Sequence, residues 1–339
     1  MSLHQVYGQF NKNRRAVWSL RVLVGLVLLV IIAPLVANDR PLLVIVKQRV
    51  YVPILFDYPE TTFDGYFKTT TYYRGDYFKD FAAKNKATVV WPLIPYSDQT
   101  HDFNLTESLP APPSMAHWLG TDDQGKDMVA GLIYGLRISM GFSLVLTVFS
   151  ICIGVVVGAV QGYYGGLVDL IGQRVLEVWS GLPTLFIIII LSSLMMPSFW
   201  TLIGIMLLFS WIGLVGRVRA EFLRERNLDY VKAAQVMGIA PMRIIMRHIL
   251  PNALITTLTM IPFILTENIV ALSSLDFLGF GLPTGSPSLG VLLAQAKDNL
   301  HAPWIGISVF ITLAVMLSIL IFIGEGLRDA LDPRLNRAC

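Results

Sequence analysis

The chain reads Asp229-Tyr230-Val231-Lys232-Ala233-Ala234-Gln235-Val236-Met237-Gly238 and, nine residues later, His248-Ile249-Leu250-Pro251. This polar segment interrupts an otherwise apolar C-terminal half. Helix formers on both sides of Gly238 predict a short helix over 229–237, a turn, and a second helix leading to Pro251. We expect Asp229 to cap the first helix and Gly238 to permit the sharp turn.

The alanine pair Ala233-Ala234 indicates what this short helix does. Small side chains let another backbone or surface approach a helix closely, so a smooth helix suits insertion into a groove of a second protein. The segment therefore predicts a docking surface and not an active site. An ordinary helix-loop-helix is the alternative that these residues alone leave open.

The whole chain has the composition of a multi-span membrane protein. Of its 339 residues 54% are hydrophobic and 14% charged, and its mean hydropathy of +0.62 exceeds that of ordinary soluble domains. Lipid offers the backbone no hydrogen-bond partners, so the membrane part is predicted to be all-α. Six apolar stretches of sufficient length begin near Val17, Ile138, Pro183, Trp200, Ala253 and Trp304.

Lysine and arginine set the expected orientation, because cytoplasmic loops carry an excess of both. Six spans with both termini in the cytoplasm satisfy every short loop. The net charge of +3 is thereby explained by topology, and no basic stripe with aromatic residues indicates nucleic-acid binding. The predicted cytoplasmic cations are Lys12, Arg14, Arg15, Arg21, Arg217, Arg219, Arg224, Arg226, Lys232, Arg243, Arg247, Arg328, Arg334 and Arg337.

The first apolar stretch fits either a secretory signal or an uncleaved anchor, because cations at 12–15 precede it and small residues close it at 33–37. Its length of about twenty residues exceeds a signal core and favours the anchor. Cleavage would leave the other five orientations unchanged. Cys152 and Cys339 provide no disulfide framework.

The segment 38–135 is polar and rich in aromatic residues, as a folded insert would be. Runs at 42–46, 50–55 and 89–94 predict strands. Topology places the insert outside the cytoplasm. Its aromatic residues form either a binding face for a partner or peptide, or the insert's own small core. They are Tyr66, Phe67, Tyr72, Tyr73, Tyr77, Phe78 and Phe81.

One stretch matches a phosphate-binding loop except at its last position. Residues 120–127 fit G-x-x-x-x-G-K, but Asp127 stands where a hydroxyl must bind Mg²⁺. The predicted position outside the cytoplasm also separates this loop from ATP. We expect Thr121 or Asp122 to cap a helix over 125–137 that leads into the second span.

No catalytic or metal-binding pattern emerges elsewhere in the sequence. Neither H-E-x-x-H nor C-x-x-C spacing occurs, and the histidines are scattered. We therefore predict a chain without enzyme activity and without catalytic, cofactor-binding or metal-ligating residues. The histidines are His4, His101, His117, His248 and His301.

The polar segment resembles the E-A-A-x-x-x-G-x9-I-x-L-P loop of binding-protein-dependent ABC importer permeases. The residues in register are Ala233, Ala234, Gly238, Leu250 and Pro251. Lys232 stands where the motif has its first Glu, which removes a carboxylate through which a partner contact is expected. His248 replaces the Ile and resembles the peptide and nickel subfamily.

The resemblance extends over about residues 119–334. Residues 119–127, 135–139, 162–166 and 275–281 resemble the second permease of dipeptide and oligopeptide importers. The insert and the stretch 286–290 look closest to the permease of the microcin C and longer-peptide importer.

This resemblance implies an all-α polytopic membrane protein of the type I ABC importer permease fold, with six transmembrane helices and a periplasmic α/β insert between helices 1 and 2. The implied divisions are a cytoplasmic N-terminal arm with the first transmembrane helix (1–37), the insert (38–135), and an ABC transmembrane domain with five helices (136–339) that contains a cytoplasmic coupling loop (217–251).

The resemblance also implies a machine of several subunits in the bacterial inner membrane. A second homologous permease would form a heterodimer with this chain, and a periplasmic peptide-binding protein would deliver peptide. Two cytoplasmic ATP-binding subunits, or one fused ATPase, would bind ATP and Mg. Their closure would drive alternating access and move peptides, including microcin C-like ones, into the cytoplasm. Membrane lipid would surround the spans.

Within that machine the polar segment is expected to be the ATPase-coupling helix. Glu267 lies near the middle of the fifth apolar stretch, where an ionisable group is costly and usually faces a bundle interior or water. It is expected either to line the translocation path, to be paired structurally or to be held neutral. The expected coupling residues are Asp229, Tyr230, Lys232, Ala233, Ala234, Gly238, Leu250 and Pro251.

Two smaller features have structural explanations. Arg174 and Glu177 are expected to form a solvated pair in a loop, and Gly154 and Gly158 to allow close helix packing. Two functions of other classes stay open. A proton-coupled secondary peptide transporter would need inverted repeats and several intramembrane acids. A membrane-anchored periplasmic receptor or assembly factor would need far fewer than six spans.

Overall fold

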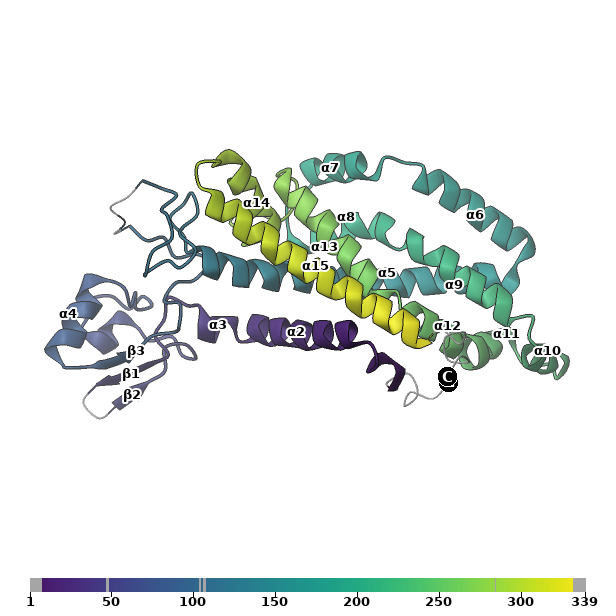
Figure 1. The fold of residues 1–339 in the computed structure, drawn as a ribbon, viewed down its shortest axis with the longest axis horizontal. Coiled ribbons are helices and arrows are strands. Elements are labelled where there is room, and N and C mark those ends of the chain that lie inside the picture. Colours follow the sequence, from purple (N-terminus) through teal and green to yellow (C-terminus); the bar gives the residue numbers. More distant parts are fainter. Residues whose placement is uncertain (1–7, 47–48, 104, 106–107, 284, 332–339) are drawn as a thin grey trace. The chain divides into compact units, whose positions relative to one another are not determined.

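The computed structural model describes residues 8–46, 49–103, 105, 108–283 and 285–331 (Figure 1). The cations predicted at Arg334 and Arg337 lie outside these residues. The chain divides into two compact units. The first is drawn from residues 1–23, 139–284 and 314–339, and the second from residues 24–138 and 285–313.

Long apolar helices dominate the chain, as expected of an all-α membrane protein. Both α5, Met128–Tyr164, and α15, Pro303–Leu331, are long and apolar enough to cross a membrane. Three bent helix pairs raise the number of candidate spans in the described ranges to as many as five. The pairs are α6, Gly166–Ser180, with α7, Thr184–Leu194 (72°); α8, Phe199–Ser210, with α9, Ile212–Glu225 (45°); and Pro241–Leu258 with α13, Ile261–Phe277 (54°).

The first of the six expected spans corresponds to α2, Arg14–Ile31, which precedes the short α3, Ala33–Val36. Its 18 residues include Arg14, Arg15 and Arg21, and it is not among these candidates. Two of the arginines occupy its first two positions, where cations commonly flank a membrane helix. In the described part of the chain, length and composition thus support two spans, or up to five if each bent pair is one span, where the sequence predicts six.

The structure corrects the expectation of a loop before the third span. Arg174 and Glu177 lie in α6, with 2.6 Å between Arg174 Nη1 and Glu177 Oε2. Both side chains are exposed, so the pair is solvated as predicted. The helix is interrupted before Pro183, because proline lacks an amide hydrogen and disfavours helical geometry in the preceding residue.

Three glycines of α5 allow α9 to pack directly against it. A Cβ at Gly154 would lie 3.0 Å from Leu214 Cδ2, and one at Gly158 would lie 2.8 Å from Val218 Cβ. At Gly162 the distance to Phe222 Cβ would be 2.5 Å. The small-residue pattern predicted to mean packing is thus confirmed, and it fixes the register of α9 along α5.

The second unit contains a three-stranded antiparallel sheet in the order β2-β1-β3. Its strands confirm the three predicted runs, shortened where a proline follows. β2 ends before Pro53 and β3 before Pro92, because proline cannot donate to a ladder hydrogen bond. The strands are β1, Leu43–Val46, β2, Arg49–Tyr51, and β3, Thr88–Val90.

The aromatic residues of this segment divide into a core and an exposed set. Phe63, from the 3-10 helix η1, Glu60–Phe63, contacts Tyr73, Phe78 and Phe81 edge to face with ring centroids 5.4–5.8 Å apart. Phe78 and Phe81 belong to α4, Asp76–Lys84. Tyr73, Phe78 and Phe81 therefore confirm the small-core interpretation. Tyr66, Phe67 and Tyr72 are exposed.

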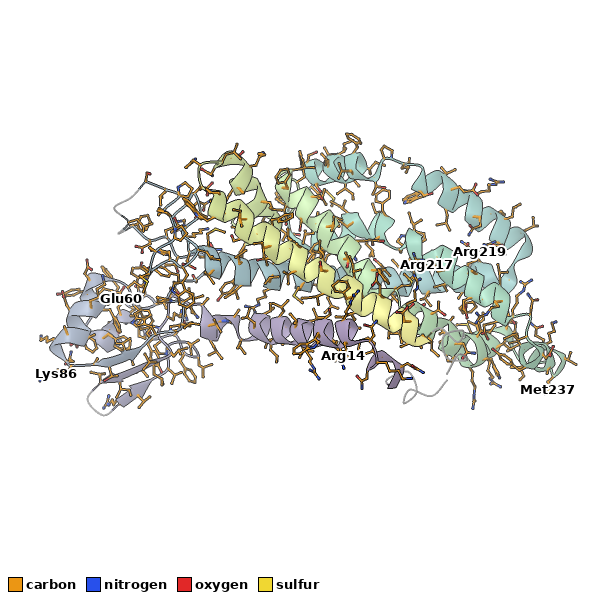
Figure 2. The ribbon with its side chains drawn as sticks, viewed as in Figure 1. Arg14, Glu60, Lys86, Arg217, Arg219 and Met237 are labelled. Carbon is orange, nitrogen blue, oxygen red and sulfur yellow. The ribbon has the colours of Figure 1, made fainter. Side chains whose placement is uncertain are left out.

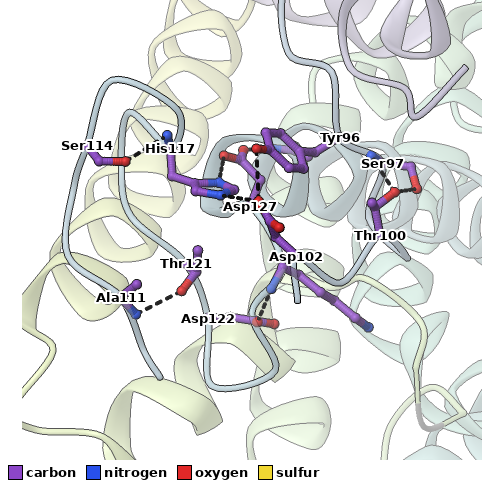
Figure 3. A network of polar contacts seen from close by, with 12 residues as sticks. Tyr96, Ser97, Thr100, Asp102, Ala111, Ser114, His117, Thr121, Asp122 and Asp127 are labelled. Atoms are coloured by element: carbon purple, nitrogen blue, oxygen red, sulfur yellow. Dashed lines mark hydrogen bonds and ion pairs between the residues drawn. The ribbon is translucent and has the colours of Figure 1, made fainter. Parts of the chain in front are cut away.

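The loop before α5 holds the stretch that resembled a phosphate loop (Figure 3). Asp122 Oδ1 accepts hydrogen bonds from the amides of Gln124 (2.9 Å) and Lys126 (2.8 Å). Asp127 Oδ1 accepts from the amide of Ala130 (2.9 Å), so Asp127 caps α5. The expectation that Thr121 or Asp122 would cap the helix was wrong, because the Asp122 carboxylate accepts its hydrogen bonds from amides within the loop. Asp127, the residue that departs from the phosphate-loop motif, therefore caps the start of α5.

His117 is buried between two carboxylates in the same loop (Figure 3). Its Nδ1 lies 2.9 Å from Asp127 Oδ2, and its Nε2 lies 3.4 Å from Asp102 Oδ2, which also accepts from the Tyr96 hydroxyl (3.1 Å). Burial lowers the pKa of His117, but the hydrogen bonds and charges of both aspartates raise it above its ordinary value overall. Protonated His117 therefore stabilises the loop that begins α5.

A further helix, α14, Leu289–Asp298, packs against this loop within the second unit. Ser288 caps it by accepting from the amide of Val291 (3.1 Å). Gln295 Nε2 donates to Asp123 Oδ1 (2.8 Å), and Leu292 faces Gly131 of α5. The second unit is thus held by hydrogen bonds at its loops and apolar contacts between its helices.

The glycine contact predicts opposite effects for two alanine substitutions in α5. Gly162→Ala places a Cβ against Phe222 and should destabilise the purified chain by about 1–3 kcal/mol. Gly141→Ala is the matched control, because a Cβ there meets no described atom within 4 Å, and it should be neutral or stabilise by up to about 1 kcal/mol. Thermal unfolding in detergent measures both, and equal effects would contradict the close contact.

The His117 geometry predicts a pH-dependent stability. Because the folded-state pKa is raised, the stabilisation is complete below the unfolded pKa of about 6.5 and is lost as pH rises through the folded-state value. The unfolding temperature of wild type should therefore fall between about pH 6 and about pH 8 more than that of His117→Gln. His301→Gln, at an exposed histidine, should follow wild type. Identical pH profiles for all three would refute the assignment.

Candidate functional site

The predicted coupling loop forms a chain of short helices in the first unit (Figure 1). After α9 ends at Glu225, three residues lead into α10, Asp229–Val236. A turn at Gly238 is followed by α11, Pro241–Ile244, then by a π-helical turn, Ile245–Ile249, and by α12, Leu250–Leu258. The predicted helix, turn and second helix are therefore present.

The start of α10 differs from the sequence expectation. Leu228 is the N-cap residue, and Asp229 is the first helical residue, so the prediction that Asp229 caps the helix was wrong. Its exposed carboxylate lies in the first turn, where a negative charge interacts favourably with the helix dipole. The tyrosine that follows, Tyr230, donates its hydroxyl hydrogen to Glu225 of α9.

The two alanines of α10 have opposite surroundings. Ala234 is 2% exposed and packs in a core cluster with Val231, Ile244 and Ile249. Ala233 is exposed beside Lys232. The expectation that both alanines present a smooth outer face is therefore wrong for Ala234. Its small side chain instead allows α10 to lie close to α11 and the π-helical turn.

Three large apolar side chains are highly exposed at the end of α10 and on α11. Val236 is 89% exposed, Met237 71% and Met242 67%. Figure 2 labels Met237 at the end of α10. Sequence reasoning missed these three residues because it looked for small side chains, whereas an exposed group of large apolar side chains is the stronger sign of a docking surface.

Gly238 ends α10 in a Schellman motif. The amide of Gly238 donates to the carbonyl of Gln235 (3.0 Å), and the amide of Ile239 donates to the carbonyl of Ala234 (3.1 Å). The φ of Gly238 is +72°, which is left-handed, and a Cβ there would meet none of the described atoms within 4 Å. The glycine is therefore required by its backbone conformation and not by lack of space.

The helix that contains Pro251 continues past it, contrary to the expectation that it ends there. Pro251 lies in the first turn of α12, which runs to Leu258. The preceding π-helical turn carries a hydrogen bond from the amide of Leu250 to the carbonyl of Ile245. The widened turn accommodates a proline that supplies no amide hydrogen.

Arg219 of α9 and Arg226, which directly follows α9, tie this helix to α6 and to the end of α5. Arg219 Nη2 lies 2.6 Å from Asp169 Oδ2, with a second contact from Arg219 Nε to the other carboxylate oxygen. Arg226 Nη1 donates to the carbonyl of Tyr163 (2.9 Å) beside Gly165, where φ is +63° and a Cβ would clash with this guanidinium. The sequence explained these arginines by topology alone and missed these contacts.

Glu267 lines a cavity of about 300 Å³ within the first unit. Arg217 of α9 lines the same cavity, and so does Asn268, whose Nδ2 donates to Thr147 Oγ1 (2.9 Å). Glu267 itself is exposed, whereas Asn268 is buried. An acidic, a basic and an amide side chain thus line the same cavity. The role of Glu267 in a translocation path stays a prediction.

The long apolar helices and the bent helix pairs define a multi-pass membrane protein. Residues 128–337 match the family model described as binding-protein-dependent transport system inner membrane component. Residues 3–49 match that of the N-terminal TM domain of oligopeptide transport permease C. The chain belongs to the family of binding-protein-dependent ABC transporter permeases, and is a multi-pass inner-membrane transport subunit.

Two known relatives match nearly the full length of this chain, and a third matches about two thirds of it. The chain is 51% identical over 327 residues to the inner membrane ABC transporter permease protein YejE of Escherichia coli, covering 96% of both chains. It is 46% identical to the peptidoglycan transport system permease protein YejE of Agrobacterium fabrum, covering 96% of this chain and 91% of that one. It is 34% identical to the oligopeptide transport system permease protein OppC of Lactococcus lactis, over 69% and 81%.

A solved structure supports the fold. A chain of the MetNI methionine ABC transporter in inward-facing conformations aligns with a TM-score of 0.51 at 16% identity, covering 60% of this chain and 98% of that one. The type I importer permease fold expected from the sequence is therefore confirmed.

The left-handed turn at Gly238 predicts a graded response to substitution. Gly238→Val should destabilise the chain by about 1–2 kcal/mol, because a β-branched residue is disfavoured at positive φ. Gly238→Asn should cost less, since asparagine tolerates this conformation. Detergent unfolding temperatures test the order, and a Gly238→Val protein as stable as Gly238→Asn would contradict it.

Proposed function

We propose that this permease imports peptides from the periplasm and receives the energy of ATP hydrolysis through α10. The proposed partners are a second permease in a heterodimer, two ATP-binding subunits or one fused ATPase, and a periplasmic peptide-binding protein. ATP and Mg are bound by the ATPases, and this chain has no ATPase site of its own. Both termini are cytoplasmic, and residues 38–135 form a periplasmic insert.

The exposed apolar surface on a rigidly packed helix carries the proposal. Val236, Met237 and Met242 present large side chains outward, while Val231 and Ala234 bury the opposite face of α10. A monomer gains nothing from exposing such side chains, so a partner is expected to cover them. An ATPase groove would bury the methionines, whose flexible side chains adapt to an irregular surface.

Arginine placement supports a cytoplasmic position for this surface. Arg224, Arg226, Arg243 and Arg247 all lie within the coupling loop 217–251, and positive charge favours the cytoplasmic side. In the same topology the insert and the loop with His117 lie in the periplasm. The exposed Ala233 and Lys232 then belong to the face that approaches the ATPase.

The names of the relatives support a peptide substrate. Two are peptide or peptidoglycan transport permeases by name, and peptidoglycan contains short peptides. The cavity with Glu267 and Arg217 offers both charges that a peptide's termini require. We therefore include Glu267 in the proposed path. Neither a secondary transporter nor a receptor would need an apolar docking helix in the cytoplasm.

Matched methionine substitutions test the docking surface. Met237→Asp puts a charge into the proposed ATPase contact and should reduce co-purification of the ATPase from detergent by at least about tenfold, with loss of ATP-dependent peptide uptake. Met115→Asp is the control, because Met115 is 95% exposed and lies in the insert. It should retain both properties.

Two outcomes would contradict the proposal. Wild type that brings down no ATPase under mild detergent excludes an ATP-driven subunit, and uptake that survives Met237→Asp together with ATPase binding removes α10 as the contact. Uptake that is abolished by a proton uncoupler while ATP is maintained would instead support a proton-coupled transporter.

A further inference from the structure

Glu225, the last residue of α9, is an acid buried inside the coupling loop. It is 4% exposed, whereas Arg224 and Asp229 on either side of it are exposed. An ionised carboxylate withdrawn from water is costly unless it is paired and hydrogen-bonded. Its position therefore depends on the groups that surround it.

Those groups come from three different helices. The Tyr230 hydroxyl of α10 donates to Glu225 Oε2, and Asn252 Nδ2 of α12 donates to the same oxygen (3.3 Å). Arg224 Nη2, from α9 itself, lies 3.3 Å from Glu225 Oε1. Asn252 Nδ2 also lies 3.4 Å from the Tyr230 hydroxyl, which closes the network. One carboxylate thus joins α9, α10 and α12.

The network lies over apolar contacts between the same elements. Phe222, Val231 and Ile249 are each fully buried in one core cluster, together with Ala253 of α12. Apolar contacts are non-directional and permit small sliding movements, whereas hydrogen bonds to a charged group fix distance and angle. The carboxylate therefore adds a geometric constraint that the apolar cluster does not provide.

Without that constraint α10 could hinge at both ends. Three residues connect it to α9, and a left-handed glycine turn follows it. A force on α10 would then bend these joints instead of moving α9 and α12. Each of those two helices continues into a bent candidate span, α8 with α9 and α12 with α13.

We propose that Glu225 is a positioning residue that makes α9, α10 and α12 move as one body, so that displacement of α10 reaches both bent spans. This inference rests on the proposed function, because it concerns how α10 transmits the movement of an ATPase. Tyr230 and Asn252 are the partners through which it acts. Glu225 itself contacts neither ATP nor the transported molecule.

The assembled transporter, reconstituted in vesicles with its ATPase and binding protein, provides the test. Asn252→Ala and Glu225→Ala should leave ATPase co-purification and ATP hydrolysis within about twofold of wild type, while peptide imported per ATP hydrolysed falls about tenfold. Glu225→Gln keeps the shape and an acceptor oxygen, and should restore part of this ratio. Glu177→Gln is the control, because Glu177 pairs with Arg174 within α6 and is not part of this network.

The outcomes separate this inference from the proposed function. Wild-type import per ATP in Asn252→Ala and Glu225→Ala overturns the positioning role while leaving ATP-driven import intact. A loss of import that tracks lower unfolding temperature, equally in hydrolysis and uptake, also overturns it, since that is the result of a merely structural residue. Absence of ATP-dependent uptake by wild type refutes the proposed function itself.

Discussion

The close approach of α9 to α5 is the contact on which the helical loop 217–251 of the first unit depends. Gly154, Gly158 and Gly162 leave no room for a Cβ, so Leu214, Val218 and Phe222 lie directly on the α5 backbone. Helices that touch this closely cannot slide past one another, because the interior is packed without free space. The register of α9 along α5 is thereby fixed.

The polar contacts at the end of α9 follow from that register. Arg219 reaches Asp169, Arg226 reaches the carbonyl of Tyr163, and Glu225 faces α10 and α12. Each of these groups would be costly if buried without its partner. The orientation of the proposed docking surface therefore depends on the position of α9, which the three glycines of α5 fix.

The sequence predicted the helices and the turn of the candidate site, but not which side of each helix is buried and which is exposed. The positions of glycine and proline predicted the helix, the turn and the second helix, because both residue types determine the local backbone conformation. The inward position of Ala234 and the outward position of Met237 depend on which side of α10 meets α11 and the π-helical turn. Similarly, the start of α5 was assigned to Thr121 or Asp122, since several residues could serve as caps and the loop selects Asp127.

Sequence by itself determined that the chain is a helical membrane protein, where its apolar stretches begin, and which transport family its polar segment resembles. Those properties follow from composition and from the backbone's need for internal hydrogen bonds in lipid. Tertiary structure alone decided the bends within the spans, the burial of Glu225 between three helices and the pairing of His117 with two aspartates. The contacts of Glu225 and His117 join separate helices and loop segments, and local propensity carries no information about which faces of those segments meet.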